Sequence, residues 1–240
     1  MPAQPTPTVF ITGADKGLGL ALANIFLNNR FHVFAGKFTR ARGALDRLAA
    51  LHPARLTLIR QDVASMPSIR RSARELAKRT PALDILINNA GITFQQTKLP
   101  LPATDLADGH LEAIMAVNTF GPLRVTQQFL PLLERGRRKR IVNITSEAGS
   151  IAGCTRESWF GYCMSKTALN VQSQLLQRYL APRGFKVLAI HPGWLQTDMG
   201  GPQATIDPAA SAAGIFTLAT KKWSARSPIY MDYNGKPMRW

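Results

Sequence analysis

The sequence predicts a doubly wound α/β fold: a mostly parallel sheet between two layers of helices. Short continuous apolar runs alternate with longer stretches of helical periodicity, as in crossover units that build a parallel sheet. The apolar runs do not alternate with polar residues, so both faces of the strands are expected to be buried. With 240 residues, of which 45% are hydrophobic, a single Rossmann-type domain over residues 1–240 accounts for the chain.

Seven apolar runs predict strands, at residues 9–12, 32–35, 56–59, 85–87, 141–144, 187–190 and 228–230. Stretches with apolar residues every three or four positions predict helices. These are residues 18–27, 44–51, 68–78, 106–134 and 161–180, and the fourth is expected to bend near Gly121 and Pro122.

A loop over residues 194–206 follows the sixth predicted strand and ends at Asp207 and Pro208. Aspartate is a good N-cap and proline suits the first helical turn, so another helix is expected to begin there. Loops at the carboxyl ends of parallel strands bind ligands, and we expect this loop to be a substrate lid.

Residues 1–8 are polar and proline-rich, and we interpret them as a short flexible lead-in without an apolar signal segment. No run approaches the roughly 18 apolar residues of a membrane span. We therefore expect a cytoplasmic protein with no membrane partner.

The composition is strongly basic, with 30 Lys and Arg against 14 Asp and Glu and a net charge of +16. Binding to nucleic acid or to an acidic carrier protein is one alternative. The charge is dispersed, however, and its densest run, residues 135–140, falls where a solvated turn is expected. We expect no nucleic-acid partner, because an anionic cofactor or substrate explains the sign of the charge equally well.

Cysteine and histidine form no pattern typical of a metal site or a disulfide framework. Their positions are Cys154, Cys163, His32, His52, His110 and His191. We expect no metal.

A glycine-rich turn joins the first predicted strand to the first helix. Gly13, Gly17 and Gly19 have the spacing G-x-x-x-G-x-G. Glycines let the backbone approach a diphosphate, and the helix N-terminus favours its negative charge. The turn therefore predicts a dinucleotide site.

Tyr162 and Lys166 are four residues apart in a predicted helix, so both side chains lie on one face. A free tyrosine has a pKa of about 10, which a neighbouring ammonium lowers. Such a phenol can serve as a general acid or base. Ser146, after the fifth strand, can donate a hydrogen bond to an oxygen that develops charge. With the glycine turn, these residues indicate a nicotinamide oxidoreductase.

In this order, the patterns resemble the short-chain dehydrogenase/reductase family along nearly the whole chain. The resemblance implies a catalytic set of Asn118, Ser146, Tyr162 and Lys166. In that set, Lys166 also binds the ribose hydroxyls and Asn118 holds a proton-relay water.

Further support comes from Asn88-Asn89-Ala90-Gly91 after the fourth strand and from Pro192-Gly193 followed by Thr197. Within the family, the ending of the chain and the region after the sixth strand are similar to the sniffer/C-factor group of carbonyl reductases. The implied cofactor contacts are Gly13, Asp15, Lys16, Gly17, Leu18, Gly19, Lys37, Arg40, Asp62, Val63, Asn89, Ala90, Gly91, Tyr162, Lys166, Pro192, Gly193, Leu195 and Thr197.

No acid follows the second strand to accept the adenosine ribose hydroxyls, which favours NADP(H) over NAD. Lys37 and Arg40 follow that strand instead, and Lys16 resembles the basic residue of NADP-preferring members. Family members often have arginine where Phe38 stands, so the residue that binds the 2′-phosphate stays open.

We therefore expect an NADPH-dependent reductase of a ketone or aldehyde, with secondary-alcohol oxidation as the reverse reaction. Phe94, Trp159 and Trp194 in the candidate loops favour a small apolar or aromatic substrate. The helices over 106–134 and 161–180 are expected to pair in a homo-oligomer, a dimer or tetramer, as they often do in the family. A regulatory or signalling protein of C-factor type is the main alternative.

Overall fold

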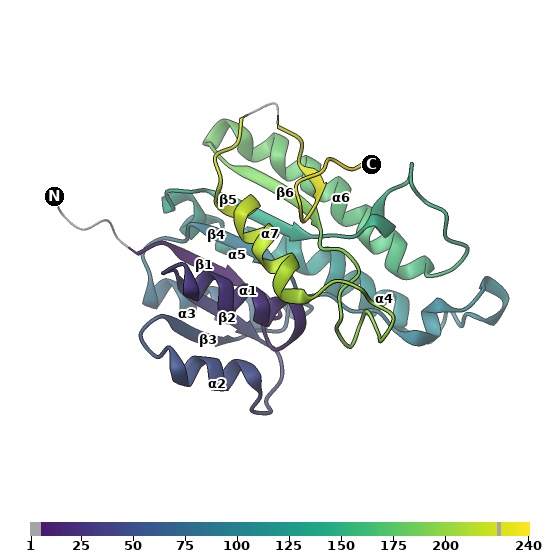
Figure 1. Ribbon diagram of the computed structural model, residues 1–240, viewed down its shortest axis with the longest axis horizontal. Helices are drawn as coiled ribbons and strands as arrows, with labels where there is room; N and C mark the ends of the chain where they lie inside the picture. The colour runs from purple at the N-terminus through teal and green to yellow at the C-terminus, as the bar shows by residue number, and fades with distance from the viewer. Residues whose placement is uncertain (1–5, 225–226) are drawn as a thin grey trace.

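The computed structural model describes residues 6–224 and 227–240, and the strands in that part of the chain form one parallel sheet (Figure 1). Their order is β3-β2-β1-β4-β5-β6-β7. The strands are β1 (Thr8–Ile11), β2 (His32–Lys37), β3 (Leu56–Arg60), β4 (Ile85–Asn88), β5 (Arg140–Ile144), β6 (Lys186–His191) and β7 (Tyr230–Asp232). In the register, Ile11 lies beside Ala35 of β2 and Ile87 of β4. The predicted fold class is confirmed.

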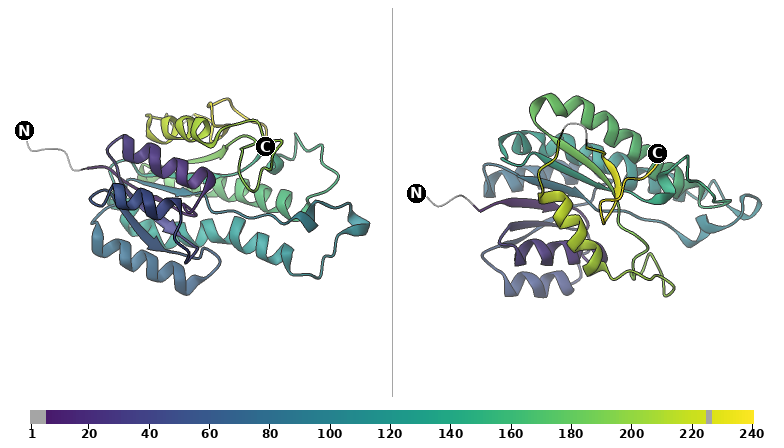
Figure 2. Two further views of the ribbon diagram at one scale, coloured as in Figure 1. Left: turned by 60° about the horizontal axis from the view of Figure 1, so that its bottom comes forward. Right: turned by 45° about the horizontal axis from the view of Figure 1, so that its top comes forward.

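Helices cover both faces of the sheet (Figure 2). One core cluster joins the sheet to α1 (Gly17–Asn28), α2 (Ala44–Leu51) and α7 (Pro208–Thr220). The other face packs against α3 (Met66–Arg79), α5 (Gly121–Arg135) and α6 (Phe160–Leu180). Phe10 and Phe129, buried on that second face, stack edge to face with ring centroids 4.7 Å apart. Both faces of the strands are therefore buried, as the continuous apolar runs predict.

The helix predicted over residues 106–134 begins later and is not uniformly α-helical. It starts with α4 (His110–Met115), after Gly109 at φ +78°. It then widens into a π-helical turn, η3 (Ala116–Phe120), before α5. Pro122 lacks the N–H that would donate to the Asn118 carbonyl, so a regular α-helical ladder cannot continue through this point. The predicted bend near Gly121 and Pro122 thus takes the form of a π turn.

Several other boundaries differ from the prediction by a few residues. Thr8, assigned to the lead-in, opens β1, Lys37, expected after the second strand, is the last residue of β2, and the last strand lies at 230–232 instead of 228–230. Residues 1–5 of that lead-in lie outside the described residues. The predicted cap of the last helix is present, because the Asp207 carboxylate accepts a hydrogen bond from the Ala209 N–H at 2.8 Å.

The order of the strands reverses between β1 and β4, because β2 and β3 lie on one side of β1 and β4 to β7 lie on the other. This position is the switch point of the sheet. Ligands of open α/β sheets bind at the carboxyl ends of such strands. In Figure 1 the loops before α4, before α6 and before α7 all project from that edge of the sheet. None of the described helices is long and apolar enough to cross a membrane.

Candidate active site

Hydrogen bonds join the ends of β1 and β4 at the switch point. Thr12 Oγ1 accepts from the Asn89 and Ala90 N–H groups at 2.9 and 3.0 Å. The Asn89 side chain donates in return to the carbonyls of Thr12 and Gly13, both at 3.0 Å. Asn89 and Ala90 therefore lie beside the glycine turn, as their place among the expected cofactor contacts requires.

The glycine turn is too close to its neighbours for side chains. Gly13 and Gly17 have φ of +62° and +55°. A Cβ on Gly13 would lie 2.9 Å from Ala90 Cα, and one on Gly19 would lie 2.2 Å from the Gly13 carbonyl oxygen. Leu18 between them is 7% exposed and anchors α1 in the core. The turn thus exposes backbone N–H groups at a helix N-terminus, which fits a diphosphate.

Both charged residues of the turn contact other loops. The Asp15 carboxylate accepts hydrogen bonds from the N–H groups of Phe38 and Thr39, both at 2.9 Å, and so orients the loop after β2. Lys16 forms an exposed ion pair with Asp198 of the 194–206 loop. Asp15 is thus a positioning residue here, and Lys16 links the phosphate cradle to the expected lid.

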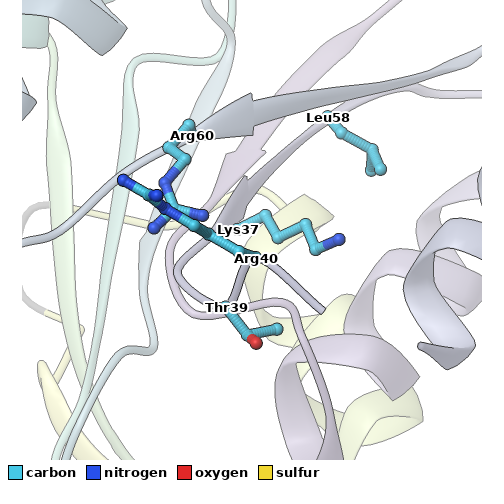
Figure 3. Close-up of a pocket in the computed structure, with 5 residues that line it drawn as sticks. All are labelled: Lys37, Thr39, Arg40, Leu58 and Arg60. Carbon is cyan, nitrogen blue, oxygen red and sulfur yellow. The ribbon is translucent and has the colours of Figure 1, made fainter. Parts of the chain in front are cut away.

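A basic pocket of about 530 Å³ lies at the carboxyl ends of β2 and β3 (Figure 3). Its lining residues are Lys37, Thr39, Arg40, Leu58 and Arg60. The Lys37 ammonium is held by both oxygens of Asp46, at 2.7 and 2.8 Å, and points away from the two guanidinium groups in Figure 3.

Arg60 was not among the expected cofactor contacts. It pairs in register with Lys37, so the shared edge of two neighbouring strands was the signal that could have found it. Arg40 and Arg60 are therefore better placed than Lys37 to bind an additional phosphate.

Asp62 and Val63 follow β3 on this same side of the switch point. The Asp62 carboxylate accepts from the Ala64 N–H at 2.9 Å. Val63 is 7% exposed and packs against Gly121. A Cβ on Gly121 would lie 3.1 Å from Val63 Cγ2. Both residues shape the turn beneath the adenosine side of the expected site.

Three of the expected catalytic side chains converge next to Gly91. Lys166 is 4% exposed, donates to the Ile144 carbonyl at 2.9 Å and lies 5.6 Å from the centroid of the Tyr162 ring. A Cβ on Gly91 would lie 3.6 Å from Lys166 Nζ and 3.4 Å from Asn118 Oδ1. The helical spacing therefore places Tyr162 and Lys166 on one face, as predicted.

Asn118 is fully buried in the π turn. Its Oδ1 accepts from the Ile92 N–H at 2.8 Å, and its Nδ2 donates to the Ile92 carbonyl at 2.9 Å. The Asn118 side chain therefore fixes the loop that leaves Gly91. The group of Asn118 that could bind a water is its backbone carbonyl, because Pro122 has no N–H to donate to it.

The electrostatics of Tyr162 differ from the expectation. Loss of solvent raises the pKa of Tyr162 to about 12, although a hydrogen bond with Ser146 opposes that rise. The Glu147 carboxylate adds to the rise and Arg156 reduces it. Burial lowers the pKa of Lys166 to about 8. The prediction of a lowered phenol pKa is therefore wrong for the chain alone, because desolvation outweighs the nearby cations.

A charged cluster that sequence reasoning missed surrounds Ser146. Ser146 Oγ donates to Glu147 Oε2 at 2.5 Å and accepts from the Ala148 N–H at 3.1 Å. Arg156 donates to the other oxygen of Glu147. His191 Nδ1 accepts from the Glu147 N–H at 3.2 Å, so His191, expected to be an ordinary histidine, joins the site. Glu147 directly follows Ser146 in the sequence, and this was the one feature that could have indicated the cluster.

The 194–206 loop is closed at its base. Leu195, 8% exposed, forms a parallel bridge with Ile206. Gly193 has φ +87°, and the Pro192 carbonyl accepts from Ser211 Oγ at 2.7 Å. A Cβ on Gly17 would lie 3.2 Å from Thr197 Cγ2. The loop therefore lies directly beside the glycine turn.

A parallel sheet with a glycine cradle and a tyrosine–lysine pair at its switch point defines a class of dinucleotide-binding α/β proteins. The model of the short chain dehydrogenase family matches residues 7–206. C-signal of Myxococcus xanthus is 38% identical over 161 residues, which is 67% of this chain and 95% of that protein. The chain therefore belongs to the short-chain dehydrogenase/reductase family of oxidoreductases, as the sequence patterns predict.

Solved structures agree with this assignment. The NADPH-bound carbonyl reductase from chicken fatty liver is 29% identical with a TM-score of 0.88, over 99% of this chain and 100% of that one. The carbonyl reductase Sniffer of D. melanogaster is 28% identical with a TM-score of 0.90, over 98% of this chain and 100% of that one. The predicted likeness to the sniffer/C-factor group is confirmed.

The buried Lys166 makes stability depend on pH. Its pKa falls from 10.5 to about 8 on folding, so between these values the folded chain binds fewer protons than the unfolded chain. The free energy of unfolding must then rise with pH in this window. Relative to Lys166→Met, we expect wild type to gain at most about 1.4 kcal/mol per pH unit. Urea unfolding of both proteins between about pH 7 and pH 10 measures this gain.

Lys78→Met, at an exposed position in α3, is the matched control and should differ from wild type by a constant amount across the same window. An equally constant difference for Lys166→Met would contradict the buried, perturbed ammonium.

Proposed function

We propose that this protein is an NADPH-dependent carbonyl reductase that reduces a ketone or aldehyde and can run the reverse oxidation of a secondary alcohol. The observation that carries the proposal is the convergence of Ser146, Tyr162 and Lys166 next to a glycine cradle. The similarity to carbonyl reductases, one of them NADPH-bound, supports it.

The residues at the switch point fit NADP(H). The backbone of the glycine turn would hold the diphosphate, and Arg40 and Arg60 would hold the 2′-phosphate. Lys166 would bind the ribose hydroxyls near Gly91, and Thr197 would lie beside the bound cofactor. When bound, the cofactor supplies a hydride to the carbonyl carbon.

Tyr162 serves as the general acid. With a pKa of about 12, its phenol keeps its proton at neutral pH and can give it to the developing alkoxide. Ser146 stabilises the charge on that oxygen. The Asn118 backbone carbonyl would hold the water through which a proton reaches the site. The reverse oxidation needs the phenolate, so its rate should rise with pH.

Tyr162→Phe removes the phenol hydroxyl with its acidic proton and keeps the ring, so turnover should fall to less than about a tenth of wild type, a loss above 1.4 kcal/mol. NADPH binding should change little. Steady-state NADPH oxidation with a panel of ketones, together with fluorescence titration of NADPH, measures both quantities. A variant with more activity than this would not be compatible with a general-acid role.

Cofactor preference should depend on the basic pocket. We expect wild type to favour NADPH over NADH by at least about tenfold in kcat/KM, because charge-assisted bonds to the 2′-phosphate are among the stronger hydrogen bonds. Arg40→Gln with Arg60→Gln should remove most of this preference. Arg71→Gln, an exposed change on α3, should not. Equal efficiency of the two cofactors in wild type would refute the assignment, and a preference that survives the double change would point to Lys16 or Lys37.

Self-association through α6 is also proposed. Along one face of this helix, large apolar side chains are 52–68% exposed. Phe120 at the end of η3 and Leu123 in the first turn of α5 are 46% and 45% exposed. The α6 residues are Met164, Val171, Leu175 and Tyr179. An apolar stripe of this kind is typical of a surface that a second copy covers.

Leu175→Glu places a charge in the middle of this stripe and should convert a dimer or tetramer into monomers in light scattering. Leu51→Glu, at a more exposed position at the end of α2, is the control and should not change the mass. A monomeric wild type would contradict the proposed homo-oligomer.

We further propose that residues 1–240 form one domain, that the 194–206 loop serves as a lid, and that the protein is cytoplasmic. The similarity to C-signal keeps a regulatory role as the second candidate, in which the cofactor binds without turnover. Activity of wild type on any carbonyl in the panel would decide against it.

A further inference from the structure

Arg156 is a cation near the expected reacting groups that the proposed mechanism does not use. It lies in the loop between η4 (Glu147–Gly149) and α6, with its guanidinium 5.0 Å from the centroid of the Trp159 ring. Trp159 in turn packs edge-on against Tyr162, with centroids 5.7 Å apart. Arg156 is therefore one side chain away from the candidate general acid.

The Arg156–Glu147 pair is accessible to small molecules. A third of the Arg156 side chain (34%) and 44% of the Glu147 side chain are exposed. Neither group is sealed in the core, so a small anion in solvent can reach the guanidinium. A bidentate guanidinium–carboxylate contact is geometrically specific, which makes arginine well suited to select one class of substrate.

The charges around Trp159 favour an anion. Lys98 Nζ lies 4.7 Å from the Trp159 ring centroid, and within the described part of the chain it forms no salt bridge. Two cations, Arg156 and Lys98, therefore lie against the Trp159 ring, and Glu147 is paired with one of them, Arg156. Glu147 also accepts a hydrogen bond from Ser146 Oγ.

We propose that the site selects carbonyl compounds that carry a carboxylate, and that this carboxylate takes the place of Glu147 on Arg156. The proposal rests on the carbonyl reductase function proposed above and names its substrate class. A neutral carbonyl compound of the same shape lacks this contact, so it should have a higher KM.

The test compares 4-acetylbenzoate with its methyl ester, which differ in charge at the end of the ring opposite the ketone. In steady-state NADPH oxidation, wild type should favour the carboxylate by at least about tenfold in kcat/KM. Arg156→Gln should abolish that preference, and Arg156→Lys should retain part of it. Glu147→Gln should strengthen carboxylate binding, since the internal competitor loses its charge. Arg71→Gln is the matched control and should behave as wild type.

Calorimetry with NADP⁺ measures binding of the same two ketones without turnover, because no hydride donor is present. Selective binding of the carboxylate that Arg156→Gln removes would support the inference even if neither ketone oxidised NADPH, a result that would count against the reductase function alone. The inference is overturned if wild type does not prefer the carboxylate in binding, or if Arg156→Gln leaves the preference intact.

Discussion

The site depends on the hydrogen bonds that join the ends of β1 and β4. Thr12 and Asn89 each bind the backbone of the other strand, and this contact fixes the glycine turn against Ala90 and Gly91. Gly91 in turn lies between Asn118 and Lys166. Because the switch point of the sheet lies here, the phosphate cradle and the tyrosine–lysine pair meet although about 150 residues separate them in the chain.

A second constraint is the burial of charge. Lys166 is held against a backbone carbonyl in the interior, where its ammonium is disfavoured. Glu147, His191 and Arg156 form a further charged cluster beside Ser146. Groups of this kind lower stability and persist where function requires them. The same electrostatics leave the Tyr162 phenol protonated at neutral pH, so the chain alone is set up to donate a proton to a developing alkoxide.

Much of this arrangement could be predicted from the sequence. Continuous apolar runs located the first six strands and overlapped the last one only at Tyr230. The order of the patterns placed Tyr162, Lys166 and Ser146 at one edge of the sheet. The π turn could not be predicted, since it results from the missing N–H of Pro122 acting within a helix whose period looks regular. The pKa of Tyr162 depends on how much solvent the fold removes, which no spacing reveals. Arg60 could have been found only from the register of β2 and β3. Arg156 and His191 reach the site through loop packing, and isolated basic residues in a basic chain do not indicate such contacts.

The most direct test of the central claim is a crystal structure of the protein with NADP⁺. The account predicts the diphosphate over the glycine turn, the 2′-phosphate between Arg40 and Arg60, and the nicotinamide ring beside Tyr162 and Lys166. A cofactor bound away from the β1–β4 switch point, or a nicotinamide ring that Tyr162 cannot approach, would contradict it.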